Sequence, residues 1–281
     1  MQKGYVCSDS ATDCFELPDA HEEVIAGVKW GLIHAFPSPA YWKYQVLSRR
    51  LQGNQIRYRL GNTFVEEVGA CLLGGHGIPA SVGLAAYEHM KRRGAFNGYL
   101  YSEADLLTWL SEPIETERKV IKYRFARQKA RYLAAALTKL NNEPYPAGSG
   151  KVLRAWLLDI PGVGYKTASW IARNWLDADD VAILDIHILR AGQLGGFLNA
   201  ELTVERDYLE IENQFILFSN GMGIRTSELD ALIWHEMMSS PLAVRRVMEA
   251  RSFSGKKNGL RVNRSRAKQR NTDPDQIPVL V

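Results

Sequence analysis

The sequence predicts a mainly α-helical, soluble globular protein. Apolar residues recur at three- and four-residue spacing along most of the chain, and few segments alternate apolar and polar residues as strands do. Breaks that contain Gly or Pro separate the helical stretches. Of the 281 residues, 46% are apolar and 23% are charged, so the chain can bury one large core or two smaller lobes.

The expected elements follow from this spacing. Residues 1–20 look irregular, and residues 45–59 are the best candidate for a strand. Helices are expected over 21–36, 60–93 with a break at 74–79, 103–111, 117–141, 151–159, 165–176, 186–194, 203–220 and 226–250.

We therefore divide the chain into three parts. Residues 1–60 form an N-terminal segment of undefined structure, residues 60–250 a helical domain, and residues 251–281 a basic tail. The region after Phe253 has almost no large apolar residues before the last five, so we expect a flexible arm.

The positive charge of the chain is unevenly distributed. The net charge is +4, but the tail holds eight Lys or Arg against two Asp and so carries +6, which leaves −2 for residues 1–250. A second basic run, residues 118–131, has seven basic residues and no acidic one. Either run could bind nucleic acid or could be an ordinary solvated surface.

Three cysteines, Cys7, Cys14 and Cys71, are too few for a four-cysteine iron–sulfur cluster and too scattered for a disulfide framework. We therefore expect chemistry without a metal or cofactor. No stretch approaches the roughly 20 apolar residues of a membrane span, and the N-terminus lacks the apolar region of a secretory signal. A cytoplasmic protein without membrane contact is expected.

The most informative stretch is residues 157–170, where one helix runs into Pro161-Gly162-Val163-Gly164 and a second helix begins at once. Glycines let the backbone approach a ligand closely, and the amide N–H groups at a helix N-terminus attract anions. We expect Gly162, Val163 and Gly164 to bind a DNA phosphate. An ordinary tight turn between packed helices is the alternative.

The helix after this turn carries its apolar residues on one side. This spacing predicts that Lys166, Trp170 and Arg173 lie on the opposite side, away from the core. Nineteen residues after Lys166, Asp185 precedes a further helix and is a natural N-cap, with His187 two positions later.

This pattern resembles the helix-hairpin-helix (HhH-GPD) DNA glycosylase superfamily, and the Lys-to-Asp separation resembles its 8-oxoguanine DNA glycosylase/AP lyase branch. The resemblance is strongest over residues 120–240. It implies a two-lobed helical fold with the site in the cleft between the lobes. It also implies that Lys166 attacks the sugar C1′ to form a Schiff base, while Asp185 stabilises the developing positive charge. His187 is then expected near the DNA backbone.

The resemblance also suggests how a flipped base is held. Trp170 and Trp234 are expected to sandwich a purine, and Asp230, one turn before Trp234, to accept hydrogen bonds from its edge. For each of the three residues, a purely structural role is the alternative. Arg127, Lys129 and Arg131 resemble the segment that reads the base opposite the lesion, although Lys129 stands where an Arg is expected and cannot make the same bidentate contact.

The sequence therefore predicts a monomeric DNA glycosylase and AP lyase that removes an oxidised purine, such as 8-oxoguanine, from double-stranded DNA. Two alternatives remain open. One is a protein of the same fold in a bacterial anti-phage operon, which acts on another modified purine or nucleotide and has defence partner proteins. The other is a non-catalytic DNA-binding protein, which needs the hairpin but not the Lys166 and Asp185 pair.

Overall fold

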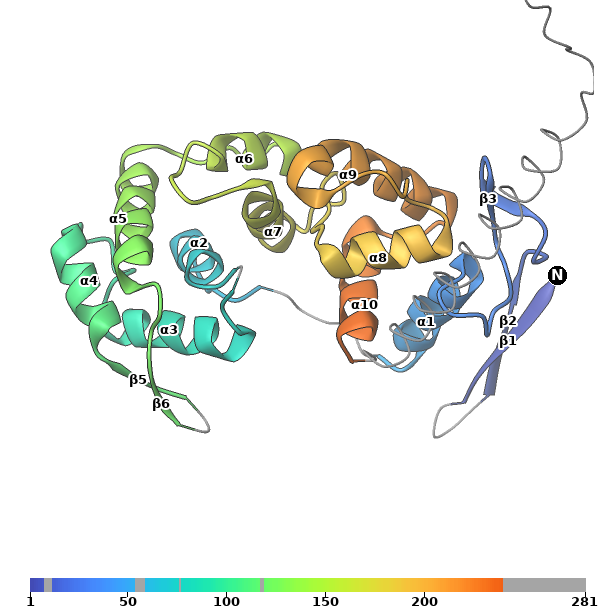
Figure 1. The fold of residues 1–281 in the computed structure, drawn as a ribbon, viewed down its shortest axis with the longest axis horizontal. Helices are drawn as coiled ribbons and strands as arrows, with labels where there is room; N and C mark the ends of the chain where they lie inside the picture. Colours follow the sequence, from blue (N-terminus) through green and yellow to red (C-terminus); the bar gives the residue numbers. More distant parts are fainter. Residues whose placement is uncertain (8–11, 54–58, 76, 117–118, 240–281) are drawn as a thin grey trace, which may run out of the picture. The chain divides into compact units, whose positions relative to one another are not determined.

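The computed structural model describes residues 1–7, 12–53, 59–75, 77–116 and 119–239, and within these ranges the protein is mainly α-helical (Figure 1). The helices are α1 Pro39–Leu51, α2 Phe64–Leu73, α3 Ala80–Arg92, α4 Glu103–Ser111, α5 Ala126–Asn142, α6 Gly150–Leu157, α7 Tyr165–Leu176, α8 Ile186–Gly195, α9 Val204–Gly221 and α10 Thr226–Ser239. None of the helices in these ranges is long and apolar enough to cross a membrane.

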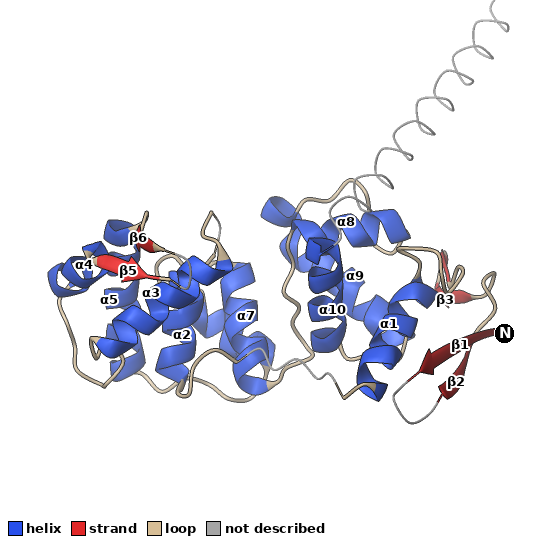
Figure 2. Ribbon diagram, turned by 90° about the horizontal axis from the view of Figure 1, so that it is seen from below, coloured by secondary structure: helices blue, strands red, loops and turns tan. Residues whose placement is uncertain are grey.

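In the part of the chain that the structure describes, three antiparallel pairs of short strands accompany the helices (Figure 2). They are β1 Gln2–Cys7 with β2 Thr12–Leu17, β3 Glu23–Ile25 with β4 Val28–Lys29, and β5 Pro113–Glu115 with β6 Val120–Lys122. Backbone contacts group Met1–His235 into one compact unit and Glu236–Val281 into a second, of which only residues 236–239 are described. The predicted tail, 251–281, lies outside the described residues.

The N-terminal sixty residues differ from the sequence prediction. Residues 21–36, expected to be helical, contain β3 and β4, because Gly27 turns the chain with a φ of +77° between the β-branched Val24-Ile25 and Val28. Residues 45–59, expected to be a strand, overlap α1, which Ser38 caps by accepting a hydrogen bond from the Tyr41 N–H. Residues 1–20 were expected to be irregular, but 2–7 and 12–17 form the antiparallel pair β1–β2.

The predicted helix over 117–141 is also wrong in its first part. Residues 120–122 form β6, whose Ile121 pairs with Ile114 of β5, and the helix begins only at Ala126. The buried Ile114 and Tyr123 anchor this hairpin to a core formed with α2, α3, α4 and α5. Among the described basic residues of this run, Lys119, Lys122 and Arg124 therefore lie on or beside β6, and Arg127, Lys129 and Arg131 lie on the first turns of α5.

A second core cluster is formed by the facing sides of α6 and α7 with residues of α2 and α5. Leu153 and Leu157 of α6 pack with Ala168, Ile171 and Ala172 of α7, and all are buried. The boundaries of α7 agree with the predicted 165–176, and those of α4 with 103–111. These helices are amphipathic and begin directly after Gly164 and Ser102, and α4 ends just before Pro113, which is why local sequence predicts them well.

A buried ion pair joins α6 to α9. Arg154 donates through Nη1 to both carboxylate oxygens of Glu212, at 2.5 and 2.6 Å, and to Ser169 Oγ of α7 at 3.2 Å. The side chains are 8% and 1% exposed. Because water cannot replace either partner here, each charge depends on the other.

We expect Arg154→Met to lower the free energy of unfolding by about 3–5 kcal/mol, because it leaves the Glu212 carboxylate buried without a cation. Urea denaturation with far-ultraviolet circular dichroism measures this change. Arg206→Gln, which removes an ion pair to the neighbouring Asp207 on the surface of α9, is the matched control and should leave stability nearly unchanged. Equal losses in the two variants would contradict the expectation.

Candidate active site

The turn between α6 and α7 presents a helix N-terminus without a side-chain cap. Gly162 has a φ of +84°, a conformation that favours glycine, and the Val163 N–H donates to Ile160 O at 3.0 Å. Gly164 is the N-cap of α7 and offers no side-chain acceptor to the first N–H groups of the helix. Val163 is buried beneath the turn, whereas Gly162 and Gly164 are exposed. The turn thus has the exposed glycines and the uncapped helix start, while anion binding there stays a prediction.

The Gly162 backbone also lies against α5. A Cβ built on Gly162 would stand 2.1 Å from Cδ2 of Tyr132, so no larger residue fits without moving this ring. The Tyr132 hydroxyl accepts a hydrogen bond from Gln128 Nε2 at 2.9 Å. The turn and the basic end of α5 are thereby held next to each other.

Lys166 and Asp185 lie together. Lys166 is the second residue of α7, and its Nζ is 3.4 Å from Asp185 Oδ2. The other oxygen, Oδ1, accepts from the His187 and Ile188 N–H groups at 2.8 and 3.2 Å, which confirms Asp185 as the N-cap of α8. The lysine side chain is 47% exposed and the aspartate 11% exposed. One carboxylate oxygen thus serves the helix, and the second faces an accessible amine.

The connection that ends at Asp185 is held by side chains rather than by backbone pairing. The Ala182 N–H donates to Glu212 Oε1 at 2.9 Å, the Ile183 N–H to Asp230 Oδ2 at 2.9 Å, and the Leu184 N–H to the Tyr208 hydroxyl at 3.2 Å. Tyr208 also donates to Ala182 O at 2.7 Å. Burial raises the pKa of the Tyr208 hydroxyl, which keeps this donor protonated.

Asp230 is a buried carboxylate, with only 1% of the residue exposed. Its Oδ2 binds Ile183, and its Oδ1 lies 3.7 Å from Nη2 of Arg173. Burial raises the pKa of Asp230 to about 6, while the positive charge of Arg173 opposes this shift. Both oxygens are turned into the protein, so the base-reading role expected for Asp230 gains no support from its position.

The expected exposed face of α7 is wrong for Trp170 and Arg173. Arg173 is buried, and Trp170 is half-buried and packs against the core cluster that contains Ile171. The Trp170 ring approaches Gly74 at the end of α2, which covers this side of α7. The helix is therefore buried on two sides, and only its first turn, with Lys166, is open. Trp234 on α10 is 36% exposed, and His187 on α8 is half-buried.

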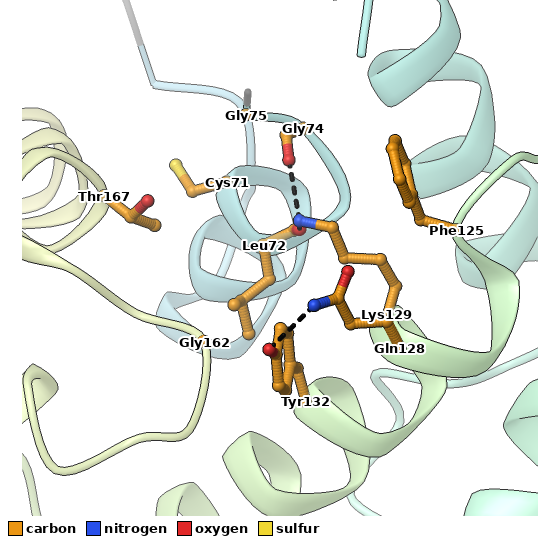
Figure 3. Close-up of a pocket in the computed structure, with 10 residues that line it drawn as sticks. All are labelled: Cys71, Leu72, Gly74, Gly75, Phe125, Gln128, Lys129, Tyr132, Gly162 and Thr167. Carbon is orange, nitrogen blue, oxygen red and sulfur yellow. Dashed lines mark hydrogen bonds between the residues drawn. The ribbon is translucent and has the colours of Figure 1, made fainter. Parts of the chain in front are cut away.

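Lys129 lies in a pocket of about 410 Å³ formed by α2, α5 and the hairpin turn (Figure 3). Its Nζ donates to Leu72 O and Gly74 O at 2.5 and 2.9 Å, which satisfies carbonyls at the C-terminal end of α2. Burial lowers the pKa of Lys129. Arg127 and Arg131, one turn apart on α5, are exposed, so the three residues expected to read the opposite base do not point alike.

Sequence reasoning missed Arg154, Tyr208 and Glu212. A signal was present on α9, because Tyr208, Ile211, Glu212 and Phe215 follow helical spacing on its buried side. A glutamate in an apolar stripe indicates a carboxylate that needs a buried partner.

The α6–α7 hairpin with its open helix N-terminus is the feature that defines helix-hairpin-helix proteins, and the paired Lys166 and Asp185 lie beside it. The family model described as 8-oxoguanine DNA glycosylase matches residues 62–224, and the chain belongs to this family.

Curated relatives of this family are named 8-oxoguanine DNA glycosylase/AP lyase. One from Methanocaldococcus jannaschii is 36% identical over 134 residues, which cover 46% of this chain and 64% of that protein. One from Metallosphaera sedula is 31% identical over 147 residues, which cover 50% and 72%. The match thus spans less than two thirds of the M. jannaschii relative.

Solved structures give lower similarity. The M. jannaschii 8-oxoguanine glycosylase/lyase in complex with DNA containing 8-oxoguanine is 24% identical with a TM-score of 0.47, and covers 72% of this chain and 91% of that one. The 8-oxoguanine DNA glycosylase of Thermotoga maritima is 22% identical with a TM-score of 0.48, and covers 70% and 88%.

We expect Gly162→Ala to lower the free energy of unfolding by about 2–4 kcal/mol, because it combines an unfavourable backbone conformation with a clash against Tyr132. Gly164→Ala is the control, since a Cβ there meets no atom within 4 Å and should cost about 1 kcal/mol or less. Thermal and urea denaturation of both variants measure the difference. A similar loss at both positions would show that the contact with Tyr132 is unimportant.

Proposed function

We propose that the protein is a bifunctional DNA glycosylase and AP lyase that removes an oxidised purine resembling 8-oxoguanine. The observation that carries this proposal is the 3.4 Å approach of Lys166 Nζ to Asp185 Oδ2 beside an open helix N-terminus. A protein that only binds DNA needs the hairpin but not this pair. Membership in the 8-oxoguanine DNA glycosylase family supports the same chemistry.

In the proposed reaction, Lys166 as the neutral amine attacks C1′ of the damaged nucleotide. The C1′–N bond breaks, and its electrons leave with the base. Asp185 stabilises the positive charge that develops on the sugar, with Oδ2 facing the reaction and Oδ1 held by α8. Loss of the amine proton and opening of the sugar then give a Schiff base. Removal of a C2′ proton expels the 3′ phosphate and cuts the strand.

We propose that the DNA backbone lies along the hairpin turn and the basic residues next to it. Lys119, Lys122, Arg124, Arg127 and Arg131 are all exposed, and none forms an ion pair with a carboxylate in the part of the chain that the structure describes. Phosphates suit such unneutralised cations. Trp234 and the open part of Trp170 remain the proposed contacts of the flipped base.

Borohydride trapping on duplexes with 8-oxoguanine opposite each of the four bases tests the chemistry. We expect the wild type to form a covalent adduct that requires the lesion, and Lys166→Gln to form none because it lacks the nucleophilic amine. Lys151→Gln, on an exposed lysine of α6, is the control for loss of a charge. DNA affinity should remain within a few-fold of wild type in both variants. If Lys166→Gln still forms adduct, the nucleophile is a different residue.

The salt dependence of DNA binding tests the proposed backbone contacts. We expect Lys122→Gln/Arg124→Gln to reduce the slope of log Kd against log salt by about 1–2, since each lost phosphate contact removes about 0.9 from it. Lys3→Gln/Lys29→Gln removes the same charge from the N-terminal strands and should leave the slope unchanged. An identical slope in both double variants would exclude this strand from the DNA interface.

A further inference from the structure

Two buried arginine–carboxylate pairs link the hairpin to the connection that ends at Asp185. Arg154 of α6 pairs with Glu212, which binds the Ala182 N–H, and Arg173 of α7 pairs with Asp230, which binds the Ile183 N–H. The second of these links starts on the same helix as Lys166 and ends two residues before Asp185. It therefore joins the two elements that carry the reacting pair.

We infer that Asp230 is a positioning residue, which holds Asp185 at its distance from Lys166 through Ile183 and Arg173. The inference rests on the proposed function, because it assigns the task of Asp230 to the geometry of that reaction. Lys166 and Arg173 are seven residues apart on α7, close to two full turns, so they share one side of the helix. The ion pair of Arg173 with Asp230 therefore restrains residues 182–184 on the side where Lys166 meets Asp185.

The surroundings of Asp230 favour a positioning role over contact with the flipped base. A carboxylate that reads a base edge must offer it an accessible oxygen, yet both oxygens of Asp230 are buried. Oδ2 accepts from the Ile183 N–H, and Oδ1, which accepts no hydrogen bond from the described residues, lies 3.7 Å from Nη2 of Arg173. Ionisation at a fully buried position is costly, and the raised pKa of Asp230 reflects that cost. An aliphatic residue would avoid it but would leave the Ile183 N–H without its acceptor and would remove the negative charge beside Arg173.

Tyr208 acts on the same connection by a separate route. Its hydroxyl accepts from the Leu184 N–H and donates to Ala182 O, so it fixes the residue directly before Asp185. Because its ring is large and buried, Tyr208→Phe removes these two hydrogen bonds with little change in shape. This variant tests the same idea without a change in charge.

The experiment compares Asp230→Asn, Tyr208→Phe and Glu228→Gln with the wild type. Glu228 is the matched control, since it is also a carboxylate on α10 paired with an arginine, Arg50, but lies outside the connection. Single-turnover excision rates and Kd are measured on duplexes with 8-oxoguanine and with a second oxidised purine. Amide hydrogen exchange at His187 and Ile188 reports on the Asp185 cap.

We expect Asp230→Asn and Tyr208→Phe to slow excision by about 10- to 100-fold, equally on both lesions, while Kd changes less than 2-fold. Exchange at His187 and Ile188 should quicken in both variants and stay unchanged in Glu228→Gln. Unchanged rates in folded Asp230→Asn would overturn the inference. So would a loss confined to one lesion, since that outcome assigns Asp230 to base recognition.

Two further outcomes are also decisive. If Asp230→Asn fails to fold, Tyr208→Phe alone decides, by the same rates and exchange. If the wild type excises neither base, the proposed function fails, but hydrogen exchange still tests whether Asp230 positions Asp185. Faster exchange at His187 and Ile188 in Asp230→Asn then supports the positioning of Asp185, and unchanged exchange overturns it.

Discussion

The candidate site depends on how the protein satisfies the backbone of residues 182–184. Peptide groups in a buried connection must find partners inside the protein, and here Glu212, Asp230 and Tyr208 supply them. Two of these partners are carboxylates, which are stable in the interior only with cations nearby. Arg154 and Arg173 provide the positive charge, and both come from the hairpin helices. The need to give the N–H groups of residues 182–184 hydrogen-bond acceptors thus joins the hairpin to α9, α10 and the start of α8.

The sequence predicted the helices around the hairpin well and the N-terminal part poorly. The range of α7 was predicted correctly because Gly164 and the amphipathic spacing after it are local signals. The segment around Gly27 contains apolar residues at helical spacing, but the turn at this glycine and the short β3–β4 pairing determine its structure. β5 and β6 have three residues each, which is too short for an alternating pattern to be visible in the sequence.

At the site, the sequence predicted the pairing of Lys166 with Asp185, but not the surroundings of Arg173 and Lys129. The first two follow from a motif and a helix cap, which are properties of neighbouring residues. Arg173 was placed on an exposed side because amphipathic spacing indicates one buried face, whereas α2 covers a second face of α7. Lys129 looked like a DNA contact in a basic run, but it donates to the last carbonyls of α2. Such tertiary contacts cannot be read from a single helix.

The double engagement of Asp185 has a consequence for the energy of the proposed reaction. A free carboxylate in water must reorient, together with its solvent, when a positive charge appears beside it, and this reorganisation raises the barrier. In this protein two amide N–H groups of α8 already fix the plane of the carboxylate through Oδ1. The carboxylate oxygen that faces the lysine is therefore already oriented when the chain folds, and little reorganisation is left for each catalytic cycle.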